Sequence, residues 1–358
     1  MSQNQKAVGN AQAIQAGGNV TLYNGMSPEQ MSQIIVALTK EISALTNEAR
    51  TTQERRFAEL KDALLLEFSN PQTKAKTEAL ADPDFQYVVR DAHEAFARRG
   101  DEELKAELVN LIAERSVHAS NTRVAQTINA SIELAGKLSR EEYSALVVIF
   151  TLQNVFIQNE IRQNIIPITD DILENFVNFL PKDGFSIQYL LSLGCMQANQ
   201  FAALSFENVL TQKYLHTFGP GFMSEELENS CGNDDEFLKV LACTLASIDH
   251  LTDGSGQPDG CIRFNRGTES ELRRDLKALE IGEPTQDRLV ALLNSRMATE
   301  GEVVEIFRTK SRVFEKIAAF WSIPEVQQAS PTLVGKALAH SALTSKGKFN
   351  APLEIWLR

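Results

Sequence analysis

The chain has 358 residues, of which 35 are Lys or Arg and 47 are Asp or Glu, so its formal net charge is −12. With 43% hydrophobic residues it has enough apolar side chains for a sizeable core, and its length predicts two or three domains. This composition excludes disordered, collagen-like and disulfide-stapled proteins. A net-acidic chain also does not bind nucleic acid by charge alone, because that needs clustered Lys and Arg.

The cysteines and the first residues both predict a protein that stays inside the cell. Cys195, Cys231, Cys243 and Cys261 include no close pair typical of a zinc knuckle or a redox motif, so we expect reduced thiols. The sequence MSQNQKAV at the start lacks the apolar core of a signal peptide. The longest apolar run, residues 145–150, is far shorter than the roughly 20 residues of a spanning helix. We therefore expect a cytoplasmic protein without membrane contact, and a buried core helix at this run.

The first 25 residues carry almost no charge and predict a short β arm. Two extended pieces, residues 12–16 and 19–22, flank Gly17 and Gly18, and a Gly-Gly pair between extended segments is typical of a hairpin turn. A lone hairpin of this length is not stable in water. Either the arm frays as an ordinary chain end, or it pairs with the same arm of another copy.

A long helix is predicted to follow the arm. Ser27 can cap its start, with Pro28 at the first helical position and Gln30 at the third. Apolar residues then recur at alternating spacings of four and three, a heptad seam typical of a parallel two-stranded coiled coil. A helix packed on its own domain explains the same pattern. The residues that we expect to hold copies together are Gln15, Asn19, Val20, Leu22, Met31, Ile35, Leu38, Ile42 and Leu45.

Beyond Arg50 the apolar pattern shifts phase to Phe57, Leu60 and Leu64, and this helix is expected to run to about Phe68 before an Asn-Pro pair stops it. From there the sequence predicts a mainly α fold, a multi-helix body. Its expected parts are a β arm (1–26), a long oligomerisation helix (27–70), a first helical domain (71–182) and a second helical domain (183–358).

Short polar residues and glycines predict where the body helices begin and end. Asp84 and Asp101 are predicted N-caps, Gly100 a C-terminal glycine, and residues 139–142 a capping box. Residues 185–217 are predicted to be helical.

The C-terminal half differs in charge and pattern. Residues 222–260 hold nine acidic residues and one basic residue, and such a run most often forms a solvated face. Residues 332–343 predict a short amphipathic helix, and residues 353–357 alternate like a strand. A helix followed by a terminal strand is compatible with a small winged-helix element, although one strand does not establish it. Basic residues of a weaker, DNA-binding alternative are Lys336, Lys346, Lys348 and Arg358.

The best place to look for chemistry lies between residues 249 and 260, because Asp249, His250, Asp253 and Asp259 gather there among flexible glycines. As a calcium loop the segment fails, since its third and twelfth positions offer no side-chain oxygen. Its Gly-Ser-Gly lacks the rest of a phosphate-binding fingerprint. A turn rich in Asp and Gly explains the same residues, so the four are weak catalytic candidates.

No metal or cofactor is expected from the remaining candidates. His250 with Cys243 and Cys261 lacks a fourth zinc ligand. His93 and His118 are predicted on separate helices, as surface or hydrogen-bonded side chains. The sequence contains no zinc-protease, serine-hydrolase or P-loop motif, which leaves an enzyme unsupported but not excluded.

Six stretches spread over most of the chain carry a resemblance to a known family. They are QAGGN (15–19), VRDAHEAFARRGD (89–101), LVNLIAERS (108–116), KLSREE (137–142), LG (193–194) and TLVGKALA (332–339). In this order they resemble the LPO/Vpar family of uncharacterised bacterial proteins. These are packing motifs, so the resemblance identifies no active site. The closing segment also resembles the ends of abortive-infection alpha-type proteins, which implies an intracellular bacterial conflict protein linked to phage defence.

Two functions fit these observations. The preferred one is a non-enzymatic homo-oligomer, a dimer or a dimer of dimers, in which β arms and coiled helices join the copies while the bodies recognise a phage protein or another invader component. The second is a metal-dependent enzyme acting on nucleic acid or a nucleotide, with a site at Asp249, His250, Asp253 and Asp259.

Overall fold

A computed structural model describes residues 27, 29–30, 32–33, 47–157, 164–199, 203–242, 244–246, 262–264, 266, 268–347 and 349–357. In these residues the chain is mainly helical, which confirms the predicted fold class. The elements up to the first strand are α2 (Asn47–Ser69), η1 (Thr77–Ala81), α3 (Pro83–Arg99), α4 (Glu102–Ser116), α5 (Arg123–Ala135), α6 (Arg140–Asn154), α7 (Ile165–Leu173), η3 (Val177–Phe179), α8 (Phe185–Ser192) and β1 (Met196–Ala198).

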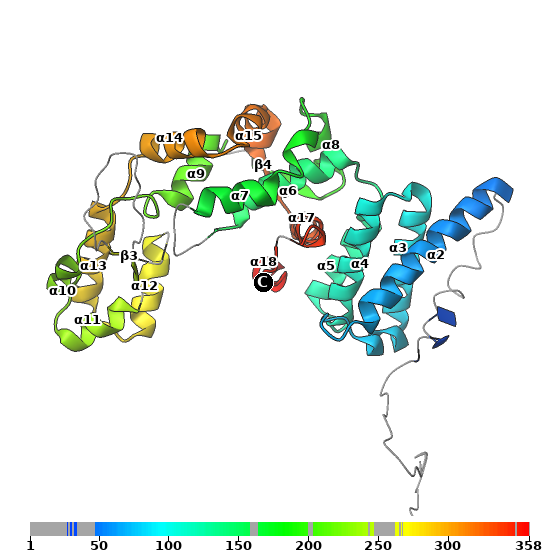
Figure 1. Ribbon diagram of the computed structural model, residues 1–358, viewed down its shortest axis with the longest axis horizontal. Coiled ribbons are helices and arrows are strands. Elements are labelled where there is room, and N and C mark those ends of the chain that lie inside the picture. Colours follow the sequence, from blue (N-terminus) through cyan, green and yellow to red (C-terminus); the bar gives the residue numbers. More distant parts are fainter. Residues whose placement is uncertain are drawn as a thin grey trace, which may run out of the picture.

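The later elements build the second half of the body and return to the first. They are α9 (Phe206–Tyr214), α10 (Ser224–Ser230), α11 (Asp234–Leu241), β2 (Thr244–Ala246), β3 (Ile262–Phe264), α12 (Glu269–Ala278), α13 (Glu283–Ser295), α14 (Glu300–Lys310), α15 (Phe314–Trp321), α16 (Pro324–Gln328), β4 (Ala329–Pro331), α17 (Leu333–Ser345) and α18 (Glu354–Leu357). Figure 1 shows α2 at one end of the longest axis and α10 to α13 at the other.

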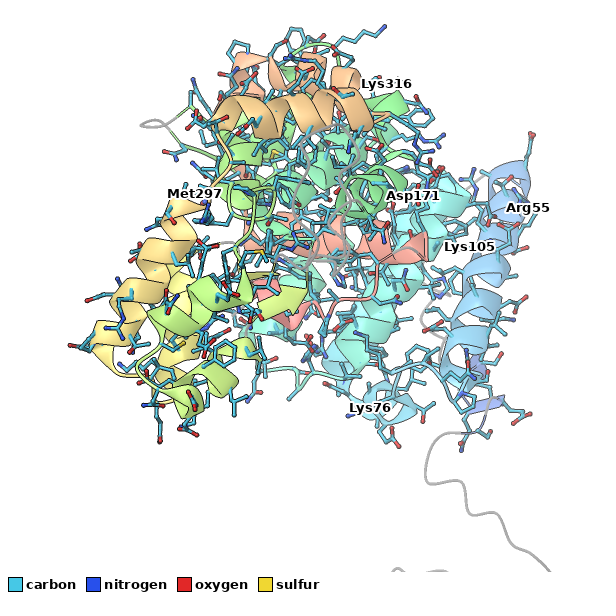
Figure 2. All side chains as sticks on the ribbon, turned by 60° about the vertical axis from the view of Figure 1, so that its left-hand side comes forward. Arg55, Lys76, Lys105, Asp171, Met297 and Lys316 are labelled. Atoms are coloured by element: carbon cyan, nitrogen blue, oxygen red, sulfur yellow. The ribbon has the colours of Figure 1, made fainter. Side chains whose placement is uncertain are left out.

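Helix α2 packs on the body along one stripe. Phe57, Leu60 and Leu64 are its buried residues, which confirms the predicted change of phase. Arg55 is exposed and lies on α2 at the edge of the molecule (Figure 2). The helix ends at Ser69, directly before the predicted Asn-Pro stop.

The predicted helix start at Ser27 is also present. The Ser27 hydroxyl accepts a hydrogen bond from the backbone amide of Gln30 at 3.2 Å. In return, the side-chain oxygen of Gln30 accepts one from the Ser27 amide at 3.0 Å. This reciprocal pair satisfies two amides that a helix start otherwise leaves without partners.

Other predicted helix ends are confirmed. The Asp101 side chain accepts from the Leu104 amide at the start of α4, and a capping box between Ser139 and Glu142 opens α6. Gly100 ends α3 with a φ of 71°, in the left-handed region that suits glycine.

The predicted cap of α3 is wrong by two residues. Asp82 caps this helix, and its side chain accepts a hydrogen bond from the amide of Asp84. Pro83 occupies the first helical position, where its missing N–H is no loss, so the cap has to precede it.

Residues 145–150 form the buried middle of α6, as predicted. All six are fully buried in the main core. Phe150 also meets the ring of Trp356 edge to face, at 5.3 Å between ring centroids. Along the described chain, no helix combines the length and apolar character needed to cross a membrane.

Helix α17 lies between helices of the first half and completes their core. It packs against α4, α5 and α6, although some 190 to 230 residues separate it from them in the sequence. Its predicted start is confirmed, because the Thr332 hydroxyl accepts from the Gly335 amide at 3.2 Å. The helix is not amphipathic, however: every residue from Ala337 to Leu343 is buried, since neighbours cover all of its sides.

The predicted strand at residues 353–357 is wrong, because this segment forms the short helix α18. Leu353 and Leu357 are buried four residues apart, which is one helix face, while Ile355 is 58% exposed. The indole nitrogen of Trp356 donates to the carbonyl of Asn154 at 3.0 Å and fixes the helix on α6. The winged-helix interpretation therefore loses the strand on which it rested, while the DNA-binding alternative is not tested.

A short strand interrupts the region predicted to be helical at residues 185–217. β1 pairs with β4 in an antiparallel register that places Met196 opposite Pro331. Gly194 follows the end of α8 at Ser192, and its φ of 72° turns the chain away from the helix direction. The partner strand lies more than 130 residues later, so local pattern could not reveal the pairing.

Residues 222–293 contribute a second apolar core. Leu227, Val240, Leu272, Leu276 and Leu289 are fully buried there. β2 and β3 form an antiparallel pair beside it, with Thr244 opposite Phe264. The predicted solvated face is confirmed for α10 and α11, where the exposed acidic residues include Glu225, Glu228, Asp234 and Asp235. The predicted four-part division of the chain stays a prediction.

Gly335→Ala tests how closely α17 is packed. A Cβ at this position would overlap the carbonyl oxygen of Cys195, which belongs to the backbone and cannot move aside cheaply. We expect the free energy of unfolding to fall by about 1–3 kcal/mol or more in urea titrations. The matched control is Gly301→Ala in α14, where a Cβ meets nothing within 4 Å; it should be neutral or stabilise by up to about 1 kcal/mol. Equal effects of both substitutions would contradict the close approach.

Candidate functional site

The predicted catalytic and oligomerisation residues lie outside the described part of the chain. This holds for the weak catalytic candidates Asp249, His250, Asp253 and Asp259, and for Cys243 and Cys261 beside them. It also holds for all of the expected oligomerisation residues: Gln15, Asn19, Val20, Leu22, Met31, Ile35, Leu38, Ile42 and Leu45. These assignments stay predictions, and the site described below is built from other residues.

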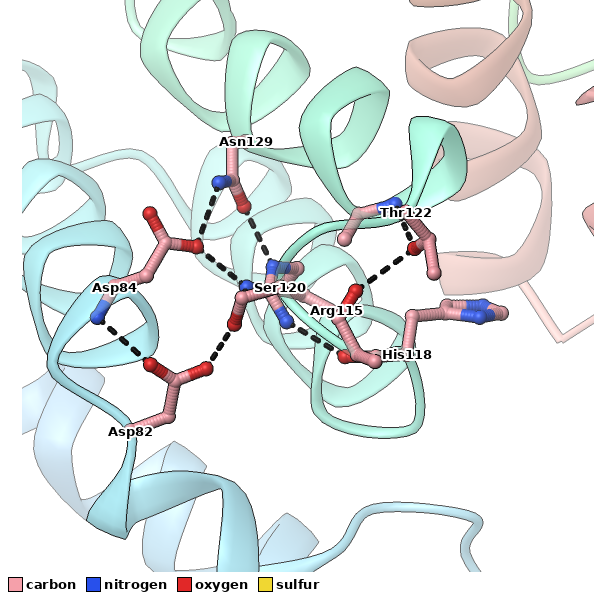
Figure 3. Close-up of polar contacts among 9 residues, drawn as sticks. Asp82, Asp84, Arg115, His118, Ser120, Thr122 and Asn129 are labelled. Atoms are coloured by element: carbon pink, nitrogen blue, oxygen red, sulfur yellow. Dashed lines mark hydrogen bonds and ion pairs between the residues drawn. The ribbon is translucent and has the colours of Figure 1, made fainter.

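A buried arginine holds the turn between α4 and α5 (Figure 3). Arg115 is only 1% exposed, and its guanidinium makes four hydrogen bonds. Nε donates to Asn129 Oδ1 at 2.7 Å and Nη1 to the His118 carbonyl at 2.9 Å. Nη2 donates to Asp84 Oδ2 at 2.6 Å and to Ser120 Oγ at 2.8 Å. The planar fork of arginine therefore fixes both ends of the turn to α3 and α5.

The start of α3 belongs to the same network. Asp82 accepts hydrogen bonds from the Asp84 amide and from the Ser120 hydroxyl. Burial raises the pKa of Asp84, but hydrogen bonds from Arg115 and Asn129 outweigh burial and lower it overall. Arg115 and Asp84 form an ion pair, and Asp82 accepts two hydrogen bonds, so the role of this network is structural: it positions the residues of the turn.

His118 sits in this turn, and its ring extends away from the arginine (Figure 3). Its Nε2 lies 3.6 Å from Glu114 Oε1 and 3.4 Å from Glu354 Oε1. The other oxygen of Glu114 pairs with Lys74 Nζ at 2.5 Å. Glu114 lies on α4 four residues before His118, while Glu354 comes from α18. We name these three residues the His118 cluster.

The His118 cluster leaves two buried polar atoms without hydrogen bonds, Glu114 Oε1 and His118 Nε2. The side chain of Glu114 is 7% exposed and that of His118 16%, so solvent does not easily supply partners. The donor atoms of all three side chains lie within 4.8 Å of one another. Carboxylate oxygens and an imidazole nitrogen at this separation can share a proton or bind one cation.

A second polar site lies two turns earlier on α4, around the buried carboxyl of Glu107. Burial raises the pKa of Glu107 to about 8, so this group holds its proton at neutral pH. It lies in a cavity of about 30 Å³ whose lining includes Tyr143, Ser144 and Arg140. Glu107 Oε2 and Ser144 Oγ have no hydrogen-bond partner. A neutral carboxyl of this kind can donate a hydrogen bond to a ligand or supply a proton.

A third polar site surrounds Lys213 on α9. Its Nζ donates to the carbonyl of Val155 at 2.8 Å, and burial lowers the pKa of Lys213 to about 7. The lysine lines a cavity of about 270 Å³ together with amide side chains that include Gln153, Gln212 and Gln327. A partly deprotonated lysine among amides can recognise a polar ligand, but no second group of the described lining is placed for proton transfer.

The expectation for the two histidines is corrected here. His93 is buried at 3% exposure, and neither of its ring nitrogens has a hydrogen-bond partner. Its ring stacks on Phe57 at 3.9 Å, and burial lowers its pKa to about 3. His118 follows the end of α4 and is mostly covered. Its spacing of four from Glu114 is visible in the sequence, whereas Glu354 is placed by tertiary packing alone.

Glu107→Gln tests the buried carboxyl through pH. In the unfolded chain the carboxyl of Glu107 has its ordinary pKa of 4.5, whereas in the folded chain burial raises this pKa to about 8. As pH rises between these values, the unfolded state binds fewer protons than the folded state, so the free energy of unfolding falls, by at most about 1.4 kcal/mol per pH unit. We expect urea titrations to show this decline in the parent protein and its loss in Glu107→Gln. Glu103→Gln at the cavity rim is the control and should follow the parent; parallel pH profiles for all three proteins would refute the assignment.

Comparisons with known proteins identify a family for this chain but no individual relative. Neither the search of curated proteins nor that of solved structures found a match. A family model matches residues 25–357, which include the Arg115 network, the His118 cluster and the Glu107 cavity. The matched range also contains five of the six stretches that carried the resemblance, from residue 89 to residue 339. The chain therefore belongs to the LPO/Vpar-like family.

Proposed function

We propose that this chain is a homo-oligomeric defence protein of the bacterial cytoplasm, in which an N-terminal stem joins the copies and the helical bodies recognise an invader component. The observation that carries the stem is the way α2 leaves the body. Its buried residues begin at Phe57, and no residue from Glu48 to Arg56 is buried. At about 1.5 Å per residue, this part of the helix extends some 13 Å before it joins the core.

The point where α2 leaves the body is fixed by a polar contact. Arg56 Nη1 donates to two backbone carbonyls in the last turn of α3, those of Ala97 at 2.7 Å and Arg98 at 3.0 Å. A guanidinium at the C-terminal end of a helix interacts favourably with its dipole. The residues of α2 before Arg56 therefore extend past the end of α3, which Figure 1 shows at the edge of the molecule. This polar section would act as a spacer between the body and the predicted heptad seam.

The capped helix start at Ser27, which precedes the predicted seam, supports the same proposal. It begins a helix directly before the seam residues Met31 to Leu45, and a seam of three heptads needs a partner helix to cover it. Sister copies provide such a partner without any further protein. Several joined bodies would turn weak individual contacts with an invader into strong binding. The defence role itself is supported by the resemblance of the closing segment to abortive-infection proteins.

Mass measurement in solution tests the stem. We expect the full chain to form a dimer or a dimer of dimers, and a version lacking residues 1–46 to be a folded monomer, because α2 and its core residues remain. A version lacking residues 1–26 separates the arm from the seam and should keep the dimer. Ile42→Asp should weaken the oligomer by placing an unpaired charge in the seam, whereas Glu48→Gln on the polar spacer should not. A full chain that is monomeric at micromolar concentration would refute the stem.

Phage challenge tests the defence role. Bacteria that produce the full chain should form fewer plaques with at least some phages than bacteria that carry an empty vector. Ile42→Asp should lose this protection if assembly is required, and Glu48→Gln should retain it. Absence of protection against a broad phage panel, with the protein soluble and oligomeric, would refute the defence role while leaving the stem intact.

A metal-dependent enzyme acting on nucleic acid or a nucleotide is the second candidate. One observation favours it, namely that three carboxylates and an imidazole gather between Asp249 and Asp259. It predicts that Asp253→Ala abolishes protection although the oligomer and the fold remain. Unchanged protection by the Ala variants of Asp249, His250, Asp253 and Asp259 would refute it.

A further inference from the structure

We infer that Glu114, His118 and Glu354 form a three-ligand site for a divalent transition-metal ion, best matched by Zn²⁺, which joins the C-terminal helix α18 to the turn between α4 and α5. This inference goes beyond the proposed function and does not depend on it. It concerns residues that the metal-dependent enzyme hypothesis does not use.

The separations of the donor atoms fit one ion. Zn²⁺ binds imidazole nitrogen at about 2.0–2.1 Å and carboxylate oxygen at about 2.0–2.2 Å, so two ligands on a tetrahedral ion lie about 3.3–3.6 Å apart. His118 Nε2 lies 3.6 Å from Glu114 Oε1 and 3.4 Å from Glu354 Oε1. All three donor atoms lie within 4.8 Å of one another, which also limits the separation of the two carboxylate oxygens. These distances are also too long for good hydrogen bonds.

The second observation is that two of these atoms make no hydrogen bond. Glu114 Oε1 and His118 Nε2 are buried and make no hydrogen bond, although the Glu114 side chain is 93% buried. A buried polar atom without a partner costs about 1–3 kcal/mol, and more for a charged group. One cation between the three side chains would satisfy both atoms at once. It would also neutralise the two carboxylates, of which Lys74 pairs with only one.

The ligands are held in place by their surroundings. The His118 carbonyl accepts from Arg115, and the His118 amide donates to the Arg115 carbonyl at 3.2 Å, so the backbone of this residue is fixed on both sides. Lys74 holds the outer oxygen of Glu114 at 2.5 Å and leaves the inner one facing His118. On α18, buried Leu353 and Leu357 flank Glu354. Such supporting contacts orient ligands and are typical of metal sites.

The same residues determine how solvent reaches the ion and which metal the site prefers. The Glu354 side chain is 32% exposed, which opens one side of the cluster to solvent and leaves a coordination position for water. His340 lies nearby on α17, but its Nε2 already bonds to the carbonyl of Ala351 at 2.7 Å, so it is not counted as a ligand. One imidazole and two carboxylates without a thiolate favour Zn²⁺ or Mn²⁺ over softer ions.

Metal titration of the full chain tests the site. After treatment with a chelator and dialysis, we expect one equivalent of Zn²⁺ to bind and to raise the melting temperature. His118→Ala and Glu354→Gln should lose this equivalent and the rise in melting temperature, with helical circular dichroism unchanged. His216→Ala and Glu225→Gln, which lie outside the cluster, should behave like the parent protein. Binding that survives both cluster substitutions, or no binding at millimolar Zn²⁺, would overturn the inference.

Cobalt distinguishes this site from the cysteines and from His250. Co²⁺ bound to oxygen and nitrogen ligands gives visible absorption without the intense thiolate charge-transfer band in the near ultraviolet. We expect the parent protein to show the first type of spectrum, and His118→Ala to lose it. A thiolate band in the parent that persists in His118→Ala would place the metal on the cysteines and overturn the assignment. If His118 merely bridges the two carboxylates as a protonated ion pair, no cobalt spectrum will form.

Discussion

The burial of α17 is the constraint on which the rest of the structure depends. From Ala337 to Leu343 this helix has no exposed residue, and α4, α5 and α6 cover it. Fully burying a leucine such as Leu338 contributes about 1.5–3 kcal/mol, while the inner faces of the covering helices gain burial in return. The core between α4, α5 and α6 is therefore complete only when α17 is in place. Contacts of such long range slow folding, but they join α17 and these three helices into one packed unit.

This packing also buries three ionisable residues of α4, and the surroundings of each differ. Arg115 is paired by four hydrogen bonds. Burial raises the pKa of Glu107 to about 8, so its side chain is neutral at pH 7. The backbone carbonyl of Glu107 accepts a hydrogen bond from the Ser341 hydroxyl of α17. Glu114 is paired at one oxygen only, by Lys74. A buried carboxylate with a partner at only one oxygen is costly. Of these three residues, Glu114 is therefore the one that a bound cation would stabilise most, through the His118 cluster.

Short-range rules allowed much of the fold to be predicted. Long-range contacts account for the errors at residues 353–357 and at β1, whereas the misplaced cap of α3 has a local cause in Pro83. The caps at Asp101 and Ser139, the phase change at Phe57 and the core run in α6 depend on residues within a few positions of each other. The five residues from Leu353 are compatible with a strand or a helix period, and only packing on Asn154 selects the helix. β1 depends on a partner strand at Ala329. For the cluster, Glu114 and His118 stand four apart in the sequence, but nothing local indicates Glu354.

Polar contacts link α2 to α18 through the body, one element to the next. Arg56 fixes α2 on the last carbonyls of α3, and Asp84 at the start of α3 binds Arg115 of α4. Arg115 holds the turn that carries His118, and His118 faces Glu354 on α18. Hydrogen bonds and ion pairs are directional, so this series fixes the orientation of the elements in a way that apolar packing alone does not. An ion at its last step would stiffen the contact between the turn and α18. α18 and α2 are thus joined by one series of contacting elements, and under the proposed function this series would connect the recognising body to the proposed stem.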